Sequence, residues 1–291
     1  MLPSFHDFFC RSPDDLRLRG RAIGPQDSTH LPVLCLPGLT RTAEDFDAVA
    51  RALAGDPKSP RRVVSMDYRG RGQSDYDPDP SNYNVVVESG DVLAVASAAG
   101  ISRAILLGTS RGGIISMVLA AAQPALLAGV IFNDVGPALE MRGLTKIKGY
   151  IANPPPRKTW DDACAGLKAL FGEVFPALTD AQWMEWTRRA FKPDGDALVR
   201  TYDPKLSHVF DAVDPDNPPP PIWGLFDKLA NVPLMLIHGA LSDLLTAQGV
   251  RDMQARRSDL EVAEVADQGH APLLEDQPTI ARISAFCRRC D

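Results

Sequence analysis

The chain alternates short apolar runs with segments of helical spacing, and this alternation limits the possible folds more than any other feature. A run without polar alternation is typical of a strand that is buried on both faces of a sheet. Such runs occupy 32–36, 63–66, 104–107, 129–133 and 233–238, and 261–265 is a further predicted strand that contains two glutamates. Segments of helical spacing occupy 42–53, 85–99, 111–122, 246–257 and 278–289. The pattern predicts an α/β fold with a mostly parallel central sheet flanked by helices.

Two segments depart from this alternation. Residues 5–24 have the pattern of a β-hairpin, because two alternating runs flank a turn rich in Ser, Pro and Asp. The interval 137–229 breaks the rhythm and holds all four tryptophans and two proline clusters. Segments of helical spacing inside it lie at 160–172 and 179–191. We therefore expect a core formed by 1–136 and 230–291, with a helical cap inserted late in the sheet.

Composition excludes some partners. The net charge of −6 and the pI near 5.4 argue against a nucleic-acid partner, because nucleic-acid binders carry a basic face. The short basic clusters have acidic neighbours, and we interpret them as solvated surface. They are Arg17, Arg19 and Arg21; Arg61 and Arg62; Arg256 and Arg257; and Arg288 and Arg289. Residues 104–132 form the most hydrophobic region, but Arg111, Gln123 and Pro124 interrupt it, so no membrane span is expected.

The cysteines and the N-terminus carry little signal. Cys287 and Cys290 have a CxxC spacing, but no second pair or histidine lies nearby, so neither a zinc site nor a redox site is expected. No other spacing of His, Cys and Asp offers a metal site, and we expect no cofactor. The N-terminal residues lack a charged stretch followed by an apolar one, so we expect no signal peptide and a cytoplasmic location.

The clearest chemical signal is a G-x-S-x-G sequence, Gly108-Thr-Ser-Arg-Gly112, between a predicted strand and a predicted helix. A serine in this strand–turn–helix setting acts as a nucleophile. A sharp turn would expose the hydroxyl of Ser110 above the carboxyl ends of the strands, which requires small neighbours. The helix N-terminus that follows favours negative charge developing beside it. We predict that Ser110 is a catalytic nucleophile.

A serine hydroxyl needs a base, and among the five histidines His270 has the best position. It lies between the last predicted strand and the last predicted helix, at the carboxyl edge of the sheet where ligands bind. A third residue must orient the imidazole. Asp243 follows the strand 233–238 on the same edge and is the favoured acid. Asp134 ends the strand 129–133 and is the alternative.

An acyl-transfer site also needs N–H groups that face the developing oxyanion. The N–H of Arg111, directly after the serine, is one candidate. The N–H of Leu39 is the other, because its loop follows a predicted strand. Pro37 cannot donate, and Gly38 lets the backbone approach closely.

These motifs resemble those of the α/β-hydrolase superfamily, in particular its esterase-like members with a helical cap. Besides the serine turn, Asp67-Tyr-Arg-Gly-Arg-Gly-Gln-Ser74 is similar to the family's D-x-R-G-x-G-x-S segment. Gln268-Gly-His-Ala-Pro272 is similar to its histidine loop, and Gly239-Ala-Leu-Ser-Asp243 to its acid loop. Many members carry His-Gly where this chain has Pro37-Gly38, so a role for that histidine side chain is lost here while the backbone donor remains.

The resemblance implies a serine hydrolase that forms an acyl-enzyme, because relatives that open epoxides or remove halides use aspartate where this chain has Ser110. The expected partner is a small or medium, apolar carboxylic ester. The same triad would serve a lactonase, a thioesterase or a hydrolase of β-diketone C–C bonds; acyl transfer, perhydrolysis and non-catalytic ligand sensing are further alternatives. Four tryptophans, Trp160, Trp183, Trp186 and Trp223, form either a hydrophobic substrate pocket or the packing of the cap itself.

Overall fold

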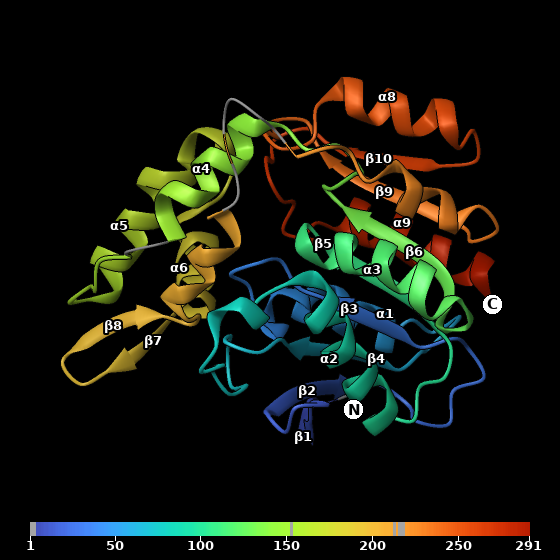
Figure 1. The fold of residues 1–291 in the computed structure, drawn as a ribbon, viewed down its shortest axis with the longest axis horizontal. Helices are drawn as coiled ribbons and strands as arrows, with labels where there is room; N and C mark the ends of the chain where they lie inside the picture. Colours follow the sequence, from blue (N-terminus) through green and yellow to red (C-terminus); the bar gives the residue numbers. More distant parts are fainter. Residues whose placement is uncertain (1–3, 152–153, 212–213, 215–218) are drawn as a thin grey trace.

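An eight-stranded sheet forms the centre of the molecule (Figure 1). The structure is a computed structural model, and it describes residues 4–151, 154–211, 214 and 219–291. In spatial order the strands are β1 (His6–Arg11), β2 (Arg17–Ile23), β4 (Val63–Asp67), β3 (Val33–Leu36), β5 (Ala104–Thr109), β6 (Leu127–Asn133), β9 (Leu234–Gly239) and β10 (Glu261–Val265). Strand β2 pairs antiparallel with β1 and β4, and every other pair is parallel. The predicted fold class is confirmed.

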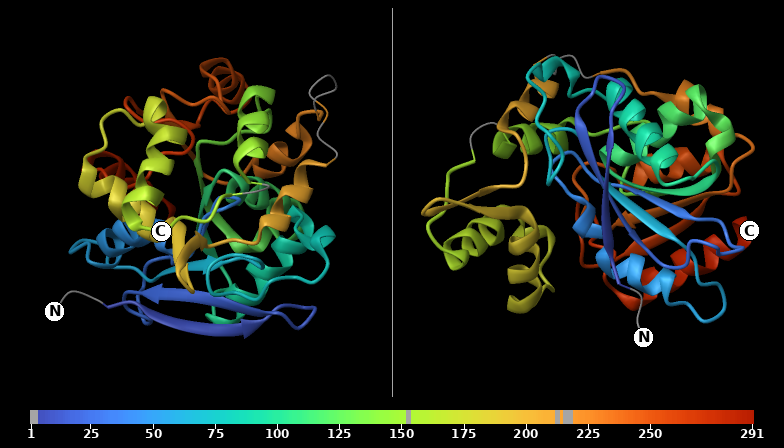
Figure 2. Two further views of the ribbon diagram at one scale, coloured as in Figure 1. Left: turned by 90° about the vertical axis from the view of Figure 1, so that its left-hand side faces the viewer. Right: turned by 90° about the horizontal axis from the view of Figure 1, so that it is seen from below.

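Helices cover both faces of the sheet (Figures 1 and 2). They are α1 (Asp47–Ala54), α2 (Val85–Ala98), α3 (Arg111–Ala122), α7 (Trp223–Phe226), α8 (Ala247–Arg256) and α9 (Gln277–Cys290). In β3, Val33 and Cys35 pack with α1 and α9, whereas Leu34 and Leu36 pack with the cluster that includes α2, α3, α7 and α8. Because both faces of β3 are buried, its successive residues are all apolar.

The remaining helical turns are short. Short 3-10 helices occupy Ala43–Phe46, Pro80–Asn82, Pro124–Leu126, Gly172–Val174, Pro204–Phe210 and Asp227–Leu229. No helix within the described ranges has the length and apolar character needed to cross a membrane.

A second body of structure, which we call the cap, stands to one side of the sheet (Figures 1 and 2). It comprises α4 (Met141–Ile151), α5 (Trp160–Phe171), α6 (Asp180–Ala190) and the hairpin of β7 (Phe191–Asp194) and β8 (Ala197–Arg200). Phe175, Trp183 and Trp186 lie in its own buried apolar cluster. Helices α5 and α6 lie where helical spacing predicted them. Helix α4 and the hairpin, which turns at Gly195 with a φ of +56°, were not predicted.

The last residues of the predicted cap pack with the main core. Residues 222–229 were assigned to the insertion, but Phe226 and Leu229 are buried in the main core beside α3. The Phe226 ring lies 6.3 Å from that of Phe132 in β6, measured between centroids. This short helical stretch has no strand pattern to mark the return to the core. We therefore propose a cap that ends before residue 222.

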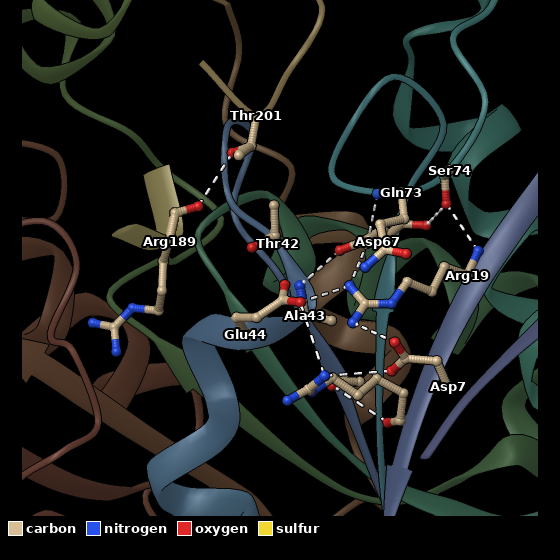
Figure 3. Close-up of polar contacts among 12 residues, drawn as sticks. Asp7, Arg19, Thr42, Ala43, Glu44, Asp67, Gln73, Ser74, Arg189 and Thr201 are labelled. Carbon is tan, nitrogen blue, oxygen red and sulfur yellow. Dashed lines mark hydrogen bonds and ion pairs between the residues drawn. The ribbon is translucent and has the colours of Figure 1, made fainter. Parts of the chain in front are cut away.

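Two arginines that we interpreted as solvated surface are buried. Arg61 is fully buried, and Arg19 is 1% exposed. The Arg19 guanidinium lies 2.9 Å from Asp7, 2.7 Å from Glu44 and 3.0 Å from Asp67 (Figure 3). A buried cation requires such partners, and here one comes from the neighbouring hairpin strand β1 and two come from distant segments. The local charge pattern therefore could not reveal the burial of Arg19.

Candidate active site

Ser110 lies in a sharp turn between β5 and α3, with φ 50° and ψ −113°. The glycines around it are sterically required. A Cβ on Gly108 would lie 2.5 Å from the backbone of Gly112, and a Cβ on Gly112 would lie 2.1 Å from the carbonyl oxygen of Leu36. The Ser110 N–H donates to the carbonyl of Asn133 at 2.9 Å, which ties the turn to β6. The strained backbone thus holds the Ser110 hydroxyl at the end of the sheet.

His270 follows β10 and its imidazole lies against the serine. Its Nε2 is 2.8 Å from the Oγ of Ser110, and its Nδ1 is 2.8 Å from the Oδ2 of Asp134. With the proton on Nδ1, the ring donates to the carboxylate and accepts from the hydroxyl, which is the arrangement a general base needs. The structure therefore brings together two of the three predicted catalytic residues, Ser110 and His270.

The favoured acid, Asp243, does not join them, and the alternative residue Asp134 does. Asp134 directly follows β6, which lies between β5 and β9, and its φ of 57° belongs to a turn at the strand end. Its carboxylate is fully buried and also accepts from the N–H of Gly239 at 2.8 Å and the hydroxyl of Ser242 at 2.6 Å. The loop that resembles the family's acid loop thus supplies donors to Asp134.

Asp243 instead faces the cap. Its carboxylate lies 2.8 Å from the Nζ of Lys146 in α4, in a pair whose side chains are 16% and 39% exposed. The sequence placed Asp134 and Asp243 at the same sheet edge, but only spatial strand order shows which one reaches His270. The useful signal was that Asp134 follows its strand without an intervening residue.

The two predicted oxyanion donors flank the serine. Residues Pro37 to Thr40 line the same pocket as Ser110 and His270, and a Cβ on Gly38 would lie 3.7 Å from the Cβ of Ser110. Among the hydrogen bonds of the described chain, the N–H of Leu39 has no acceptor. The N–H of Arg111 follows the serine directly at the start of α3. Both positions suit donors to an oxyanion formed at Ser110.

A buried ion network connects these two positions. The fully buried Arg71 donates from Nε to the carbonyl of Leu39 at 2.8 Å and from Nη1 to Glu88 at 2.6 Å. The other oxygen of Glu88 lies 2.5 Å from the Nε of Arg111. Burial alone would raise the pKa of Glu88, but the two guanidinium groups outweigh it and hold that pKa below its usual range. Arg71 belongs to the D-x-R-G-x-G-x-S segment, whose role here was not predicted.

Side chains of the cap form one wall of the pocket beside Ser110. Its cap wall includes Tyr150, Phe171, Trp186, Arg200 and Tyr202. Aromatic rings therefore form much of the surface that a ligand would meet.

Only one of the four predicted tryptophans lines this pocket. Trp186 does so, and Trp183 stacks behind it with ring centroids 5.2 Å apart. Trp160 is partly buried against the cap's apolar cluster, and the Arg188 guanidinium lies 5.0 Å from the centre of its ring. Trp223 packs with Phe226 in the main core. The packing alternative therefore describes the other three tryptophans better than a substrate-binding role.

The described residues offer no cluster of three or more His, Cys, Asp or Glu side chains that could hold a metal ion. Cys287 and Cys290 are free thiols. Burial raises the pKa of Cys287 to about 12 and that of Cys290 to about 11, so both are protonated at neutral pH.

Comparison with known proteins agrees with this geometry. The model of the alpha/beta hydrolase family matches residues 33–282. A 3-hydroxybutyrate-oligomer hydrolase of Cupriavidus necator is 34% identical over 261 residues, 87% of each chain. The crystal structure of an α/β hydrolase from Novosphingobium aromaticivorans is 38% identical and covers 98% of both chains with a TM-score of 0.89. An E-2-(acetamidomethylene)succinate hydrolase, 19% identical, shares the fold with a TM-score of 0.81 over 98% of this chain and all of its own. The chain is a member of the α/β hydrolase family.

Proposed function

We propose that the protein is a serine hydrolase that cleaves carboxylic esters through an acyl-enzyme intermediate. The observation that carries the proposal is the chain of hydrogen bonds from Asp134 through His270 to Ser110, with both imidazole contacts at 2.8 Å. A hydroxyl so placed has a base within hydrogen-bond reach, and the base has an orienting acid. Position 110 holds serine, which gives an acyl-enzyme with an ester substrate.

In the proposed reaction, the Oγ of Ser110 attacks the ester carbonyl carbon while the Nε2 of His270 accepts the hydroxyl proton. The carbonyl oxygen becomes an oxyanion that the N–H groups of Leu39 and Arg111 stabilise. His270 then donates its proton to the departing alcohol, and the acyl group remains on Ser110. A water molecule, deprotonated by His270, releases the acid and restores the serine. Asp134 stays ionised throughout and stabilises the imidazolium.

An ester substrate is favoured over the alternatives by the relative that matches 87% of the chain. The Cupriavidus necator protein acts, by its name, on 3-hydroxybutyrate oligomers, and the units of a hydroxy-acid oligomer are joined by ester bonds. The wall formed by Tyr150, Phe171 and Trp186 suits a small or medium acyl or alcohol group. We take esters of short hydroxyalkanoic acids as the proposed substrate class.

The test is hydrolysis of a p-nitrophenyl ester series from acetate to decanoate, with release of 3-hydroxybutyrate from its linear dimer measured in parallel. We expect turnover that Ser110→Ala lowers by ~10³-fold or more. Ser116→Ala is a matched control, because this serine lies in α3 directly after the Ser110 turn, and among the described residues its hydroxyl donates to the carbonyl of Gly112 and not to a catalytic residue. Turnover that survives in Ser110→Ala, or none by the wild type on any ester, would overturn the proposal.

A further inference from the structure

One cation in the pocket wall has no anionic partner among the described residues. Arg200, the last residue of β8, lines the pocket that contains Ser110. Its guanidinium lies 4.2 Å from the centre of the Phe191 ring, and its Nε is buried without an acceptor. Within the described parts of the chain, its side chain forms no ion pair or hydrogen bond. Arg200 is half-buried, and a guanidinium that is partly withdrawn from water is costly unless an anion neutralises it.

The other charged groups around the pocket are already paired. Arg41 lines the same pocket, but its guanidinium makes two hydrogen bonds to Asp45, at 2.7 and 3.1 Å. Arg189 lies 3.4 Å from Asp45 and 2.5 Å from Glu275. Among the described residues, Arg200 is therefore the arginine of this wall whose positive charge has no counter-ion. Burial lowers the pKa of Arg200, and the charge of Arg41 lowers it further.

A hydroxyl donor without a partner lies two residues further along the chain. The phenol oxygen of Tyr202 is buried and has no hydrogen-bond partner in the described part of the chain, and Tyr202 also lines the pocket. Burial raises the pKa of Tyr202 to about 12, so at neutral pH it carries a proton to donate. The segment is fixed to the core, because Thr201 accepts from the N–H of Gly72 at 2.7 Å. A guanidinium and a phenol on such a fixed segment together suit a carboxylate.

We propose that Arg200 and the hydroxyl of Tyr202 bind a carboxylate of the substrate, so that the preferred esters carry a free carboxylate beside the ester bond. The inference rests on the proposed ester hydrolysis and narrows its substrate class. Linear oligomers of hydroxyalkanoic acids have this chemistry, since one end of each oligomer is a free carboxylate. The aromatic wall would hold the alkyl part of the substrate, and Arg200 would fix its charged end.

The experiment compares esters that differ in charge alone. One pair is the acetate ester of 3-hydroxybutyrate and the same compound as its primary amide. The other is the mono-p-nitrophenyl ester of glutaric acid and its primary amide. We expect Arg200→Gln to lower kcat/KM by about 10- to 100-fold for the charged member of at least one pair and to change kcat/KM for the amides far less. Arg200→Lys should restore part of the difference, because it keeps the charge but loses the planar fork.

Arg157→Gln provides the matched control. Arg157 lies beside the same hairpin and is partly buried, but it pairs with Asp162 at 3.1 Å and does not line the pocket. Its removal should leave the ratio between charged and neutral esters unchanged. An equal fall for acid and amide in Arg200→Gln, no fall in either pair, or the same change of ratio in Arg157→Gln would overturn the proposal.

A binding measurement separates this inference from the proposed function. Ser110→Ala is titrated calorimetrically with the acetate ester of 3-hydroxybutyrate, with and without Arg200→Gln. Binding that depends on Arg200 without turnover in the wild type would keep the carboxylate site and remove the esterase proposal. Ser110-dependent hydrolysis of neutral esters, with no effect of Arg200 on charged ones, would keep the esterase and remove the carboxylate site.

Discussion

Replacing Asp134 by Asn removes the charge that faces His270 and changes little else in size. The carboxylate receives three donors: the N–H of Gly239, the hydroxyl of Ser242 and the Nδ1 of His270. An amide has one accepting oxygen, so at least one of these donors would face an NH₂ group. If the oxygen stays with Gly239, the amide nitrogen meets His270 and favours the tautomer whose proton is on Nε2. That tautomer cannot accept the proton of Ser110.

The expected cost follows from this geometry. In serine proteases, loss of the orienting carboxylate lowers kcat by ~10⁴. We expect ~10³–10⁴-fold here, or about 4–5.5 kcal/mol of transition-state stabilisation. The assay is kcat on p-nitrophenyl butyrate, with a thermal melt to verify that the variant is folded. Asp243→Asn is the matched control, because its ion pair with Lys146 is partly exposed and such pairs contribute about 0–1 kcal/mol. Near-normal kcat in Asp134→Asn, with a large loss in Asp243→Asn, would refute the assignment.

Two further predictions concern carboxylates that pair with buried arginines. Glu88→Gln leaves the guanidinium of Arg71 buried without its counter-ion, so we expect about 3–5 kcal/mol less unfolding free energy in urea titrations. Arg71 also donates to the carbonyl of Leu39, whose N–H is a proposed oxyanion donor, so kcat should fall by up to ~10²-fold while KM changes little. An unchanged kcat in the folded variant would limit Glu88 to a structural role. Hydrogen bonding from Arg69 lowers the pKa of Asp14 to about 2 from 3.8, so this carboxylate stabilises the fold above pH 3.8 and ceases to do so as the pH falls towards 2. The melting temperature of the wild type should therefore fall more steeply across this interval than that of Asp14→Asn, and parallel curves would contradict the assignment.

The sequence predicted those parts of the fold whose structure is determined by residues close together in the chain. Apolar runs gave the buried strands, and Gly108 and Gly112 marked the turn because any larger residue would collide with the backbone. His270 was found because it lies in a loop at a predictable sheet edge. In each case the determining contacts are local or follow from the alternation of strands and helices.

The missed features depend on contacts between distant segments. Asp134 and Asp243 both follow strands, and only the pairing of β6 with β5 and β9 brings Asp134 to His270. Arg19 was misjudged because its three carboxylate partners come from other parts of the chain. The hairpin of β7 and β8 was missed because Phe191-Lys-Pro-Asp194 is short and contains a proline, which is unfavourable in a strand.

The stacked tryptophans of the cap should give a spectroscopic signal that reports on the pocket beside Ser110. Trp183 and Trp186 lie nearly parallel, with an angle of 9° between their ring planes, and Trp186 forms part of the pocket wall. Indoles this close couple their electronic transitions and produce paired bands in circular dichroism. A ligand that displaces Trp186 by a small rotation would change these bands, whereas Trp223 would be unaffected in the main core. Occupancy of the pocket could thus be followed without a label and without turnover.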